Sequence, residues 1–144
     1  MSFTDEEIVY LRSQPLARVA TVGGDGQPDV VPVAFEFDGA RFWIGGVGAA
    51  VRRTRKFRNI GAGNDKVALV VDDLVSMQPF VARCVRVYGI AGEPVERVGM
   101  VGPGVYVPVT PVVSWSWNVT GPRAGEPVGE QWYEPRRAEH HGSP

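Results

Sequence analysis

The feature that most constrains the fold is an alternation of apolar and polar residues over residues 16–46, divided twice by turn signals. The stretch reads LARVATVGGDGQPDVVPVAFEFDGARFWIGG. Alternation with a period of two is typical of a strand with one buried face, and Asp-Gly is among the strongest short hairpin signals. The first break lies at Gly23 to Gly26 and the second at Asp38-Gly39. The stretch therefore predicts three consecutive strands.

Pro32 lies inside the second of these strands, in VVPVAFEF. A proline has no backbone N–H to donate to a sheet. We therefore expect Pro32 at a sheet edge, at a bulge, or where another molecule, such as a ligand, approaches the backbone.

Two short helices are predicted. In FTDEEIVYLRSQP, Thr4 is the N-cap, Glu7 completes a capping box, and Pro15 ends the helix. A second helix is expected from about residue 49 to residue 60. Its helical period gathers Arg52, Arg55, Lys56 and Asn59 on one side.

Three further strands follow, in DKVALVVDDL, in ARCVRVYGIAGEPVE, and in VYVPVTPVVSWSWNV, where Pro108 and Pro111 interrupt the last one. Six strands with two short helices predict a mainly β protein, a closed or partly closed antiparallel barrel. We expect residues 1–119 to form this domain. Residues 120–144, rich in Gly and Pro, are expected to form a loosely ordered tail.

Composition excludes several classes of protein. The chain has 144 residues, a net charge of -1 and 44% hydrophobic residues, as a soluble globular domain does. No apolar run approaches the roughly 20 residues of a membrane helix, and the acidic start MSFTDEE differs from a signal peptide. We therefore expect a cytoplasmic protein without a membrane partner. A single cysteine excludes an internal disulfide and a multi-thiolate metal site.

The usual catalytic side chains are scarce. His140 and His141 are the only histidines and lie in the expected tail, where we predict that both are solvated. This argues against a Ser-His-Asp triad and a His-ligated metal. Cys84 is interpreted as a small core residue, and Asp72-Asp73 as a turn signal at the end of a strand. No catalytic residue and no metal ligand is assigned.

The stretch RRTRKFRN, residues 52–59, carries five cations in seven positions. Residues 41–64 contain six Arg or Lys and no acid. A local patch on a nearly neutral chain favours a small anion such as phosphate over nucleic acid, which needs a broadly basic surface. A solvated basic face is the other interpretation. A bound cofactor would supply the chemistry that the side chains lack.

Four segments in order, LARVATVGGDGQPDVVPVAFEFDG, RFWIGG, TRKFRN and VRVYGIAGEP, carry a resemblance that covers residues 5–118. Together they resemble the pyridoxamine 5'-phosphate oxidase-like superfamily of flavin and deazaflavin oxidoreductases, and within it the F420-dependent branch. The resemblance implies a six-stranded antiparallel split β-barrel of the FMN-binding type. It also implies a homodimer with cofactor sites at the interface.

The resemblance also implies site residues. Those expected to hold the cofactor phosphate are Thr54, Arg55, Lys56 and Asn59. Those expected to lie against the cofactor ring are Val31, Pro32 and Val33. Trp115 and Trp117 match a late-strand pattern near the cofactor or the dimer seam, although two Trp at i and i+2 share one sheet face and are equally consistent with the core.

The function implied is that of an F420-dependent oxidoreductase. It would pass a hydride between the deazaflavin and an activated double bond, such as an enone, quinone or imine, in a small organic molecule. The proton would come from solvent, Tyr88 or Tyr106. The alternatives are an FMN-dependent oxidase or reductase, a non-catalytic F420 carrier, and a nucleic-acid-binding barrel.

Overall fold

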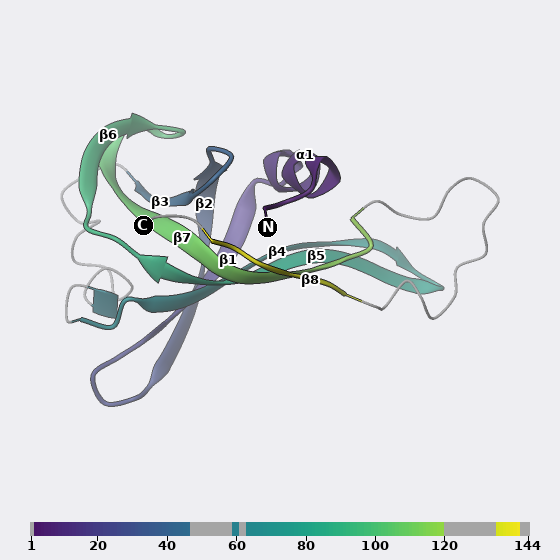
Figure 1. Cartoon of the computed structure of the whole chain (residues 1–144), viewed down its shortest axis with the longest axis horizontal. Helices are drawn as coiled ribbons and strands as arrows, with labels where there is room; N and C mark the ends of the chain where they lie inside the picture. Colours follow the sequence, from purple (N-terminus) through teal and green to yellow (C-terminus); the bar gives the residue numbers. More distant parts are fainter. Residues whose placement is uncertain (1, 47–58, 61–62, 120–134, 142–144) are drawn as a thin grey trace.

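The computed structural model describes residues 2–46, 59–60, 63–119 and 135–141 of a mainly β chain (Figure 1). Its elements, in chain order, are α1 (Asp5–Ser13), β1 (Leu16–Val22), β2 (Pro28–Phe37), β3 (Phe42–Gly46), β4 (Lys66–Met77), β5 (Phe80–Ala91), β6 (Val95–Gly99), β7 (Gly102–Trp117) and β8 (Arg136–Glu139). No helix in these ranges is long and apolar enough to cross a membrane.

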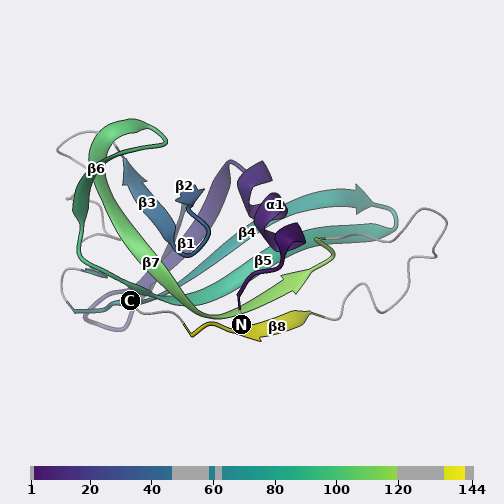
Figure 2. The same cartoon turned by 45° about the horizontal axis from the view of Figure 1, so that its top comes forward.

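Six antiparallel strands close into a barrel. Each strand pairs with the next in the order β3, β2, β1, β4, β5, β7, and β7 pairs back to β3. Strands β6 and β8 add to β7 outside this cycle, and the β4–β5 hairpin extends well beyond the barrel (Figures 1 and 2). The predicted six-stranded split barrel is confirmed, while β6 and β8 are additional short strands.

The barrel is split between β2 and β3. These two strands pair only at Phe35–Phe37 with Phe42–Ile44, and β3 then continues along β7. Residues 28–34 of β2 pair with β1 alone among the described residues, and we call them the open edge of β2. Pro32 lies in this open edge, opposite Arg18. Of the three expectations for this proline, the sheet edge is the observed one.

Both predicted turns are present. Gly26 has φ 83°, and its N–H donates to the Gly23 carbonyl at 2.9 Å. Asp38 Oδ1 accepts from the N–H groups of Ala40 and Arg41 at 2.8 and 2.7 Å, around Gly39 with φ 104°. These contacts explain why the pattern located the first three strands correctly.

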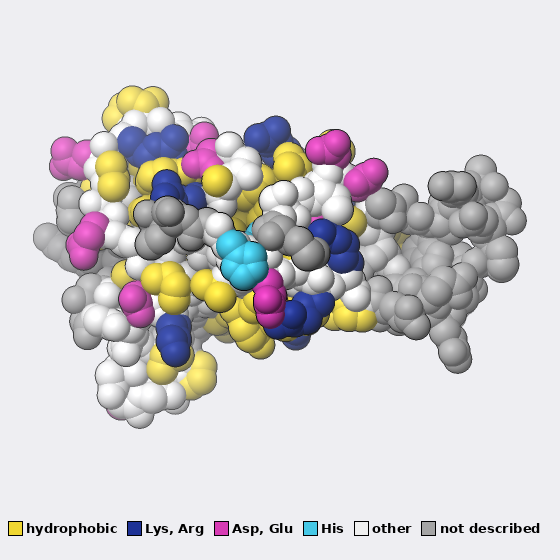
Figure 3. Space-filling model, viewed as in Figure 1, with side chains coloured by type: hydrophobic (Ala, Val, Ile, Leu, Met, Phe, Trp, Pro, Cys, Tyr) yellow, Lys and Arg dark blue, Asp and Glu magenta, His cyan; other side chains and the backbone are white. Residues whose placement is uncertain are grey.

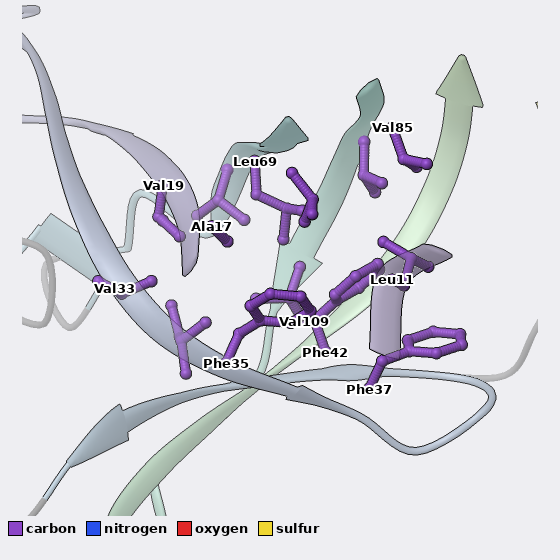
Figure 4. Close-up of a cluster of buried hydrophobic side chains, with 14 of the residues drawn as sticks. Leu11, Ala17, Val19, Val33, Phe35, Phe37, Phe42, Leu69, Val85 and Val109 are labelled. Carbon is purple, nitrogen blue, oxygen red and sulfur yellow. The ribbon is translucent and has the colours of Figure 1, made fainter. Parts of the chain in front are cut away.

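The barrel interior holds one hydrophobic core. Phe35, Phe37 and Phe42 point toward aliphatic side chains of the facing strands (Figure 4). Leu69 and Val85 are 2% and 0% exposed. Because alternate residues of a strand face opposite sides, the same strands also present a complete second set of side chains outward.

Helix α1 begins as predicted and is tied to the barrel through a buried carboxylate. Thr4 and Glu7 form the capping box. The Glu7 carboxylate is 1% exposed and also accepts from Ser116 Oγ at 2.5 Å and Arg136 Nη1 at 2.8 Å. Glu7 therefore joins α1 to β7 and β8, and it is well partnered for a buried charge.

Two details of the strand predictions are wrong. Strand β7 runs without interruption through Pro108 and Pro111, and Pro111 pairs opposite Gly89 next to a bulge, where a missing N–H is tolerated. The pair Asp72-Asp73 lies within β4 rather than at its end. Both acids form ion pairs, Asp72 with Arg18 and Asp73 with Arg83.

Candidate functional site

The outer face of the barrel brings two of the predicted site residues into one row. Directly paired residues of neighbouring strands point to the same face. The pairings join Pro32, Arg18, Val70, Arg86, Trp115 and Arg137 into a continuous row across five barrel strands and β8. Pro32 and Trp115 therefore share the outer face, although 83 positions separate them in the sequence.

Pro32 and Trp115 nevertheless stand far apart in this row. Four strand spacings of about 4.8 Å separate them, a path of about 19 Å along the curved sheet. One flat ring bound at the open edge of β2 therefore does not reach Trp115 of the same chain.

An aromatic cluster surrounds Arg86 on this face. The Arg86 guanidinium carbon lies 4.1 Å from the ring centre of Trp115 and 5.5 Å from those of Trp117 and Tyr88. Both tryptophans are half-buried and lie outside the hydrophobic core. The core interpretation of Trp115 and Trp117 is therefore wrong, because their strand neighbours Ser114 and Ser116 take the inward positions.

The three residues expected at the cofactor ring divide between the two faces. Pro32 points outward and is exposed. Val33 is 8% exposed and belongs to the core (Figure 4). Val31 is partly buried and packs against the core. The side chains of Val31 and Val33 thus shape the barrel wall, while their backbone lies at the open edge of β2.

Among the residues expected at the phosphate, Asn59 is described. It is 8% exposed, and its Nδ2 donates to Thr21 Oγ1 at 2.9 Å. Asn59 and Ile60 have helical backbone, as expected for the end of the second helix. Thr54, Arg55 and Lys56 lie outside the described residues. The basic stretch therefore ends at a residue anchored to β1, opposite the open edge of β2.

A groove of about 370 Å³ lies on the outer face beside this row. Its lining comes from five barrel strands and consists of Ala20, Thr21, Val22, Pro28, Lys66, Val67, Ala68, Tyr88, Gly89, Ile90, Val112 and Val113. This volume lies in the range of small-molecule sites, which are mostly apolar with a few polar groups.

The two tyrosines considered as proton donors have different surroundings. Tyr106 is 0% exposed, and its hydroxyl donates to the Gly102 carbonyl at 2.8 Å. Tyr88 is 48% exposed and lines the groove. Only Tyr88 of these two is therefore accessible to a bound molecule.

The remaining reactive side chains are structural. Burial raises the pKa of the Cys84 thiol to about 11, which leaves it protonated and unreactive at neutral pH.

His140 Nε2 lies 2.8 Å from Ser114 Oγ, and its ring centre lies 4.4 Å from that of Phe3. The prediction of two solvated histidines is thus wrong for His140. Figure 3 shows histidine side chains among charged groups on the face that β8 covers. No group of acids, histidines and cysteines suited to a metal ion occurs among the described residues.

The geometry defines a split β-barrel with a ligand-sized groove beside its opened edge. A model of the pyridoxamine 5'-phosphate oxidase family matches residues 4–99, about two thirds of the chain. The chain therefore belongs to the pyridoxamine 5'-phosphate oxidase family.

A relative in Streptomyces rimosus subsp. rimosus is the 5a,11a-dehydrotetracycline/5a,11a-dehydrooxytetracycline reductase. The two proteins are 50% identical over 91 residues, which is 63% of each chain. The match thus spans less than two thirds of that reductase.

Solved structures agree on the fold. An F420 reductase has a TM-score of 0.55 and 24% identity, over 70% of this chain and 90% of that one. A conserved hypothetical protein from Mycobacterium tuberculosis has a TM-score of 0.63 and 21% identity, over 89% and 94%.

Sequence reasoning did not find the groove. Ala20, Ala68 and Lys66 carry no motif, and their proximity depends on strand register. The available signal was the small outward residue in each of two strands, where larger β-branched residues are usual.

Proposed function

We propose that the protein is an oxidoreductase that uses F420 to reduce an activated double bond in a small organic molecule. The observation that carries the proposal is the 50% identity over 91 residues to a reductase whose named substrates are dehydro compounds. A dehydro compound lacks two hydrogens, so its reduction adds a hydride and a proton. The F420 reductase among the structural neighbours is consistent with this chemistry.

The open edge of β2 suits a flat cofactor ring. Pro32 presents no N–H there and lies exposed, with Arg18 beside it in the row. Val31 and Val33 direct their side chains inward, so the edge offers backbone atoms rather than side-chain bulk to a ring. Thr54, Arg55 and Lys56 would hold the cofactor phosphate, and Asn59 would position them through its bond to Thr21.

When bound, reduced F420 supplies a hydride from C5 of its deazaflavin ring. The chain's own residues orient the acceptor and exclude water from the apolar groove. The acceptor carbon that does not receive the hydride takes a proton from Tyr88 or from solvent. Tyr106 is not used, because it is buried and its hydroxyl is engaged.

The site would be completed by a second copy. Trp115 lies four strands away from Pro32 around the barrel wall of one chain, so the two residues of one chain do not frame the same ring. Two copies that pack through their outer faces would bring the aromatic cluster around Arg86 to the other copy's open edge. Sedimentation of the F420-loaded protein as a 15.6 kDa monomer would contradict this arrangement.

A parallel titration with F420 and FMN tests the cofactor. FMN is the second candidate, because the matching family is named for pyridoxamine 5'-phosphate oxidase. Tighter binding of F420 supports the proposal, and tighter binding of FMN replaces the cofactor. F420 binding without reduction of any enone, quinone or imine in a panel would instead indicate a carrier.

Substitution of the phosphate residues tests the site. Arg55→Ala and Lys56→Ala should each weaken F420 binding by about 1 to 3 kcal/mol, the loss expected for a charge-assisted hydrogen bond. Arg12→Ala, which removes an exposed arginine of α1, is the matched control and should leave the affinity unchanged. Wild-type affinity in both test variants would refute the phosphate assignment.

A further inference from the structure

The two sides of the split meet in a short ladder between β2 and β3. The paired positions are Phe35 with Ile44, Glu36 with Trp43, and Phe37 with Phe42. On its other side, β2 pairs with β1 over a much longer stretch, from Leu16 with Ala34 to Val22 with Pro28. Among the described residues, the position of β2 relative to β3 therefore depends on few main-chain pairs.

One pair of this ladder lies on the outer face. Phe35, Phe37 and Phe42 point into the core (Figure 4). Since neighbouring residues of a strand face opposite sides, Glu36 and Trp43 lie on the outer face. Both are half-buried, and they are directly opposite each other. This pair is thus the place where a third side chain can hold β2 and β3 together from outside.

Arg97 of β6 contacts both residues of this pair. Its Nη1 lies 3.2 Å from Glu36 Oε2, and its guanidinium carbon lies 4.2 Å from the ring centre of Trp43. Within the described ranges β6 pairs with β7 alone, so Arg97 joins β6 to two strands that are not its neighbours. A guanidinium can pair with a carboxylate at its edge while its plane stacks on an indole. We call Arg97, Glu36 and Trp43 the clamp.

The clamp is supported on both sides. Trp43 Nε1 donates to Asp38 Oδ2 at 2.8 Å, which holds the indole in one orientation. On the other side, Gly99 of β6 lies against the Tyr106 ring, because a Cβ at Gly99 would be 2.4 Å from Tyr106 Cζ. The Tyr106 hydroxyl donates to the Gly102 carbonyl at 2.8 Å. The hairpin of β6 and β7 is therefore closely packed, and the clamp acts from a rigid base.

The clamp holds β2 next to its open edge. Glu36 lies two residues from Ala34, about 7 Å along the strand. From Ala34 to Pro28, β2 pairs with β1 alone among the described residues. A strand that is paired on one side only can pivot about its last fixed point, and the clamp fixes that point. Side chains in a contiguous packed network can change the affinity of a site that they do not touch.

We propose that Arg97 is a positioning residue for the cofactor site. By clamping Glu36 and Trp43 it fixes the open edge of β2 relative to β3, and thereby sets the placement and the affinity of the cofactor ring. This inference rests on the proposed function for the cofactor, whereas the clamp rests on the contacts above. Arg97 differs in this from Arg55 and Lys56, which are proposed to touch the cofactor phosphate directly.

The affinity of the full chain for F420, or for FMN if that binds more tightly, tests the positioning role. Arg97→Ala should weaken cofactor binding about fivefold, as expected for a residue that acts through packed neighbours. Glu36→Gln should weaken it similarly, and the double variant should be no weaker than Arg97→Ala, because both changes break the same contact. Arg97→Lys keeps the charge without the planar stack and should recover part of the affinity. Unchanged affinity in Arg97→Ala would overturn the inference.

Glu36→Gln also separates positioning from direct binding. If Arg97 itself touched an anionic cofactor, loss of its carboxylate partner would leave the affinity unchanged or raise it, and that result would overturn the positioning role. Arg83→Ala is the matched control, because Arg83 likewise pairs with a carboxylate, Asp73, and lies over a ring, Tyr10, but does so in the β4–β5 hairpin. It should lower the melting temperature and leave cofactor affinity unchanged. An equal loss of affinity in Arg83→Ala would assign the effect to general destabilisation and refute the proposal.

Hydrogen exchange without cofactor tests the clamp independently of the proposed function. Amides of residues 28–37 should exchange faster in Arg97→Ala than in wild type, relative to those of β4 and β5, and Arg83→Ala should not show this change. A wild type that binds neither F420 nor FMN would refute the proposed function, and faster exchange in Arg97→Ala would then still support the clamp. Equal exchange of residues 28–37 in wild type and Arg97→Ala would overturn the inference, whichever cofactor binds.

Discussion

The inner and outer faces of the same strands differ in packing: the inner face is filled and buried, and the outer face is hollowed beside an exposed ring. Inside the barrel, Val19 and Leu69 are 1% and 2% exposed and close the core. Outside, their neighbours Ala20 and Ala68 leave a hollow beside Tyr88, which is 48% exposed. Adjacent residues of one strand thus fill the core on one face and line a groove on the other.

The charged groups Glu7 and Lys66 also differ between the two faces, in whether they have an ion-pair partner. Glu7 lies at the inner side and has partners from α1, β7 and β8. Lys66 lies at the groove and has no ion-pair partner among the described residues. A buried charge that is satisfied holds a fold together, whereas an exposed charge on an apolar rim is available to a ligand.

The largest effect expected from this comparison is on the core. Leu69→Ala should lower the free energy of unfolding by about 2 to 5 kcal/mol, because it leaves a cavity in a packed interior. Val30→Ala, at a position 65% exposed on the outer face, should change it by less than about 0.5 kcal/mol. Urea denaturation measures both. Equal losses would show that the two faces do not differ in the way described.

A smaller loss is expected at the buried carboxylate. Glu7→Ala removes the acceptor of Ser116, Arg136 and the Thr4 N–H, and should cost about 2 to 3 kcal/mol. Hydrogen exchange in β8 should also speed up, because Arg136 belongs to that strand. Glu6→Ala, at the exposed neighbouring position, is the control. Unchanged exchange in β8 would contradict the linking role of Glu7.

The smallest effect concerns His140. Burial lowers the pKa of His140 below its ordinary value, so the folded state favours the neutral ring. The stabilisation is therefore present above about pH 6.5 and is lost as the pH falls through the folded pKa. The N-terminal amine, Glu7, Arg136 and His141 are the ionisable groups around it.

Hydrogen exchange of residues 136–140 at pH 7.5 and pH 5 measures this effect. Exchange should be faster at pH 5, after correction for intrinsic rates, and His140→Gln should reduce the difference. A difference of the same size in the variant would assign the pH dependence to another group.

Much of the fold could be predicted because its signals are local. The capping box of Thr4 and Glu7, the Asp38-Gly39 turn and the alternation in β1 and β2 each depend on residues a few positions apart. Pro32 indicated an edge because a missing N–H has the same consequence in any fold. The candidate site was harder, since the sequence predicted Pro32 and Trp115 as site residues, which stays a prediction, and did not indicate that four strands separate them.

The elements that sequence reasoning missed depend on long-range contacts. Strand β8 forms because β7 offers a free side and Glu7 binds Arg136, 129 positions away. Asp72 and Asp73 are strand residues because Arg18 and Arg83 neutralise them there, where two acids alone would favour a turn.

By itself, the sequence determined the barrel class, the first hairpins, the α1 cap and the basic stretch, because periodicity, turn chemistry and capping act within a few residues. Tertiary structure alone decided which outward residues share a row, that Ala20 meets Ala68, that Tyr106 is buried while Tyr88 is accessible, and that His140 packs on Phe3. The reason is register: pairing distant strands sets every cross-strand neighbour, and a shift by one residue would turn each side chain to the opposite face.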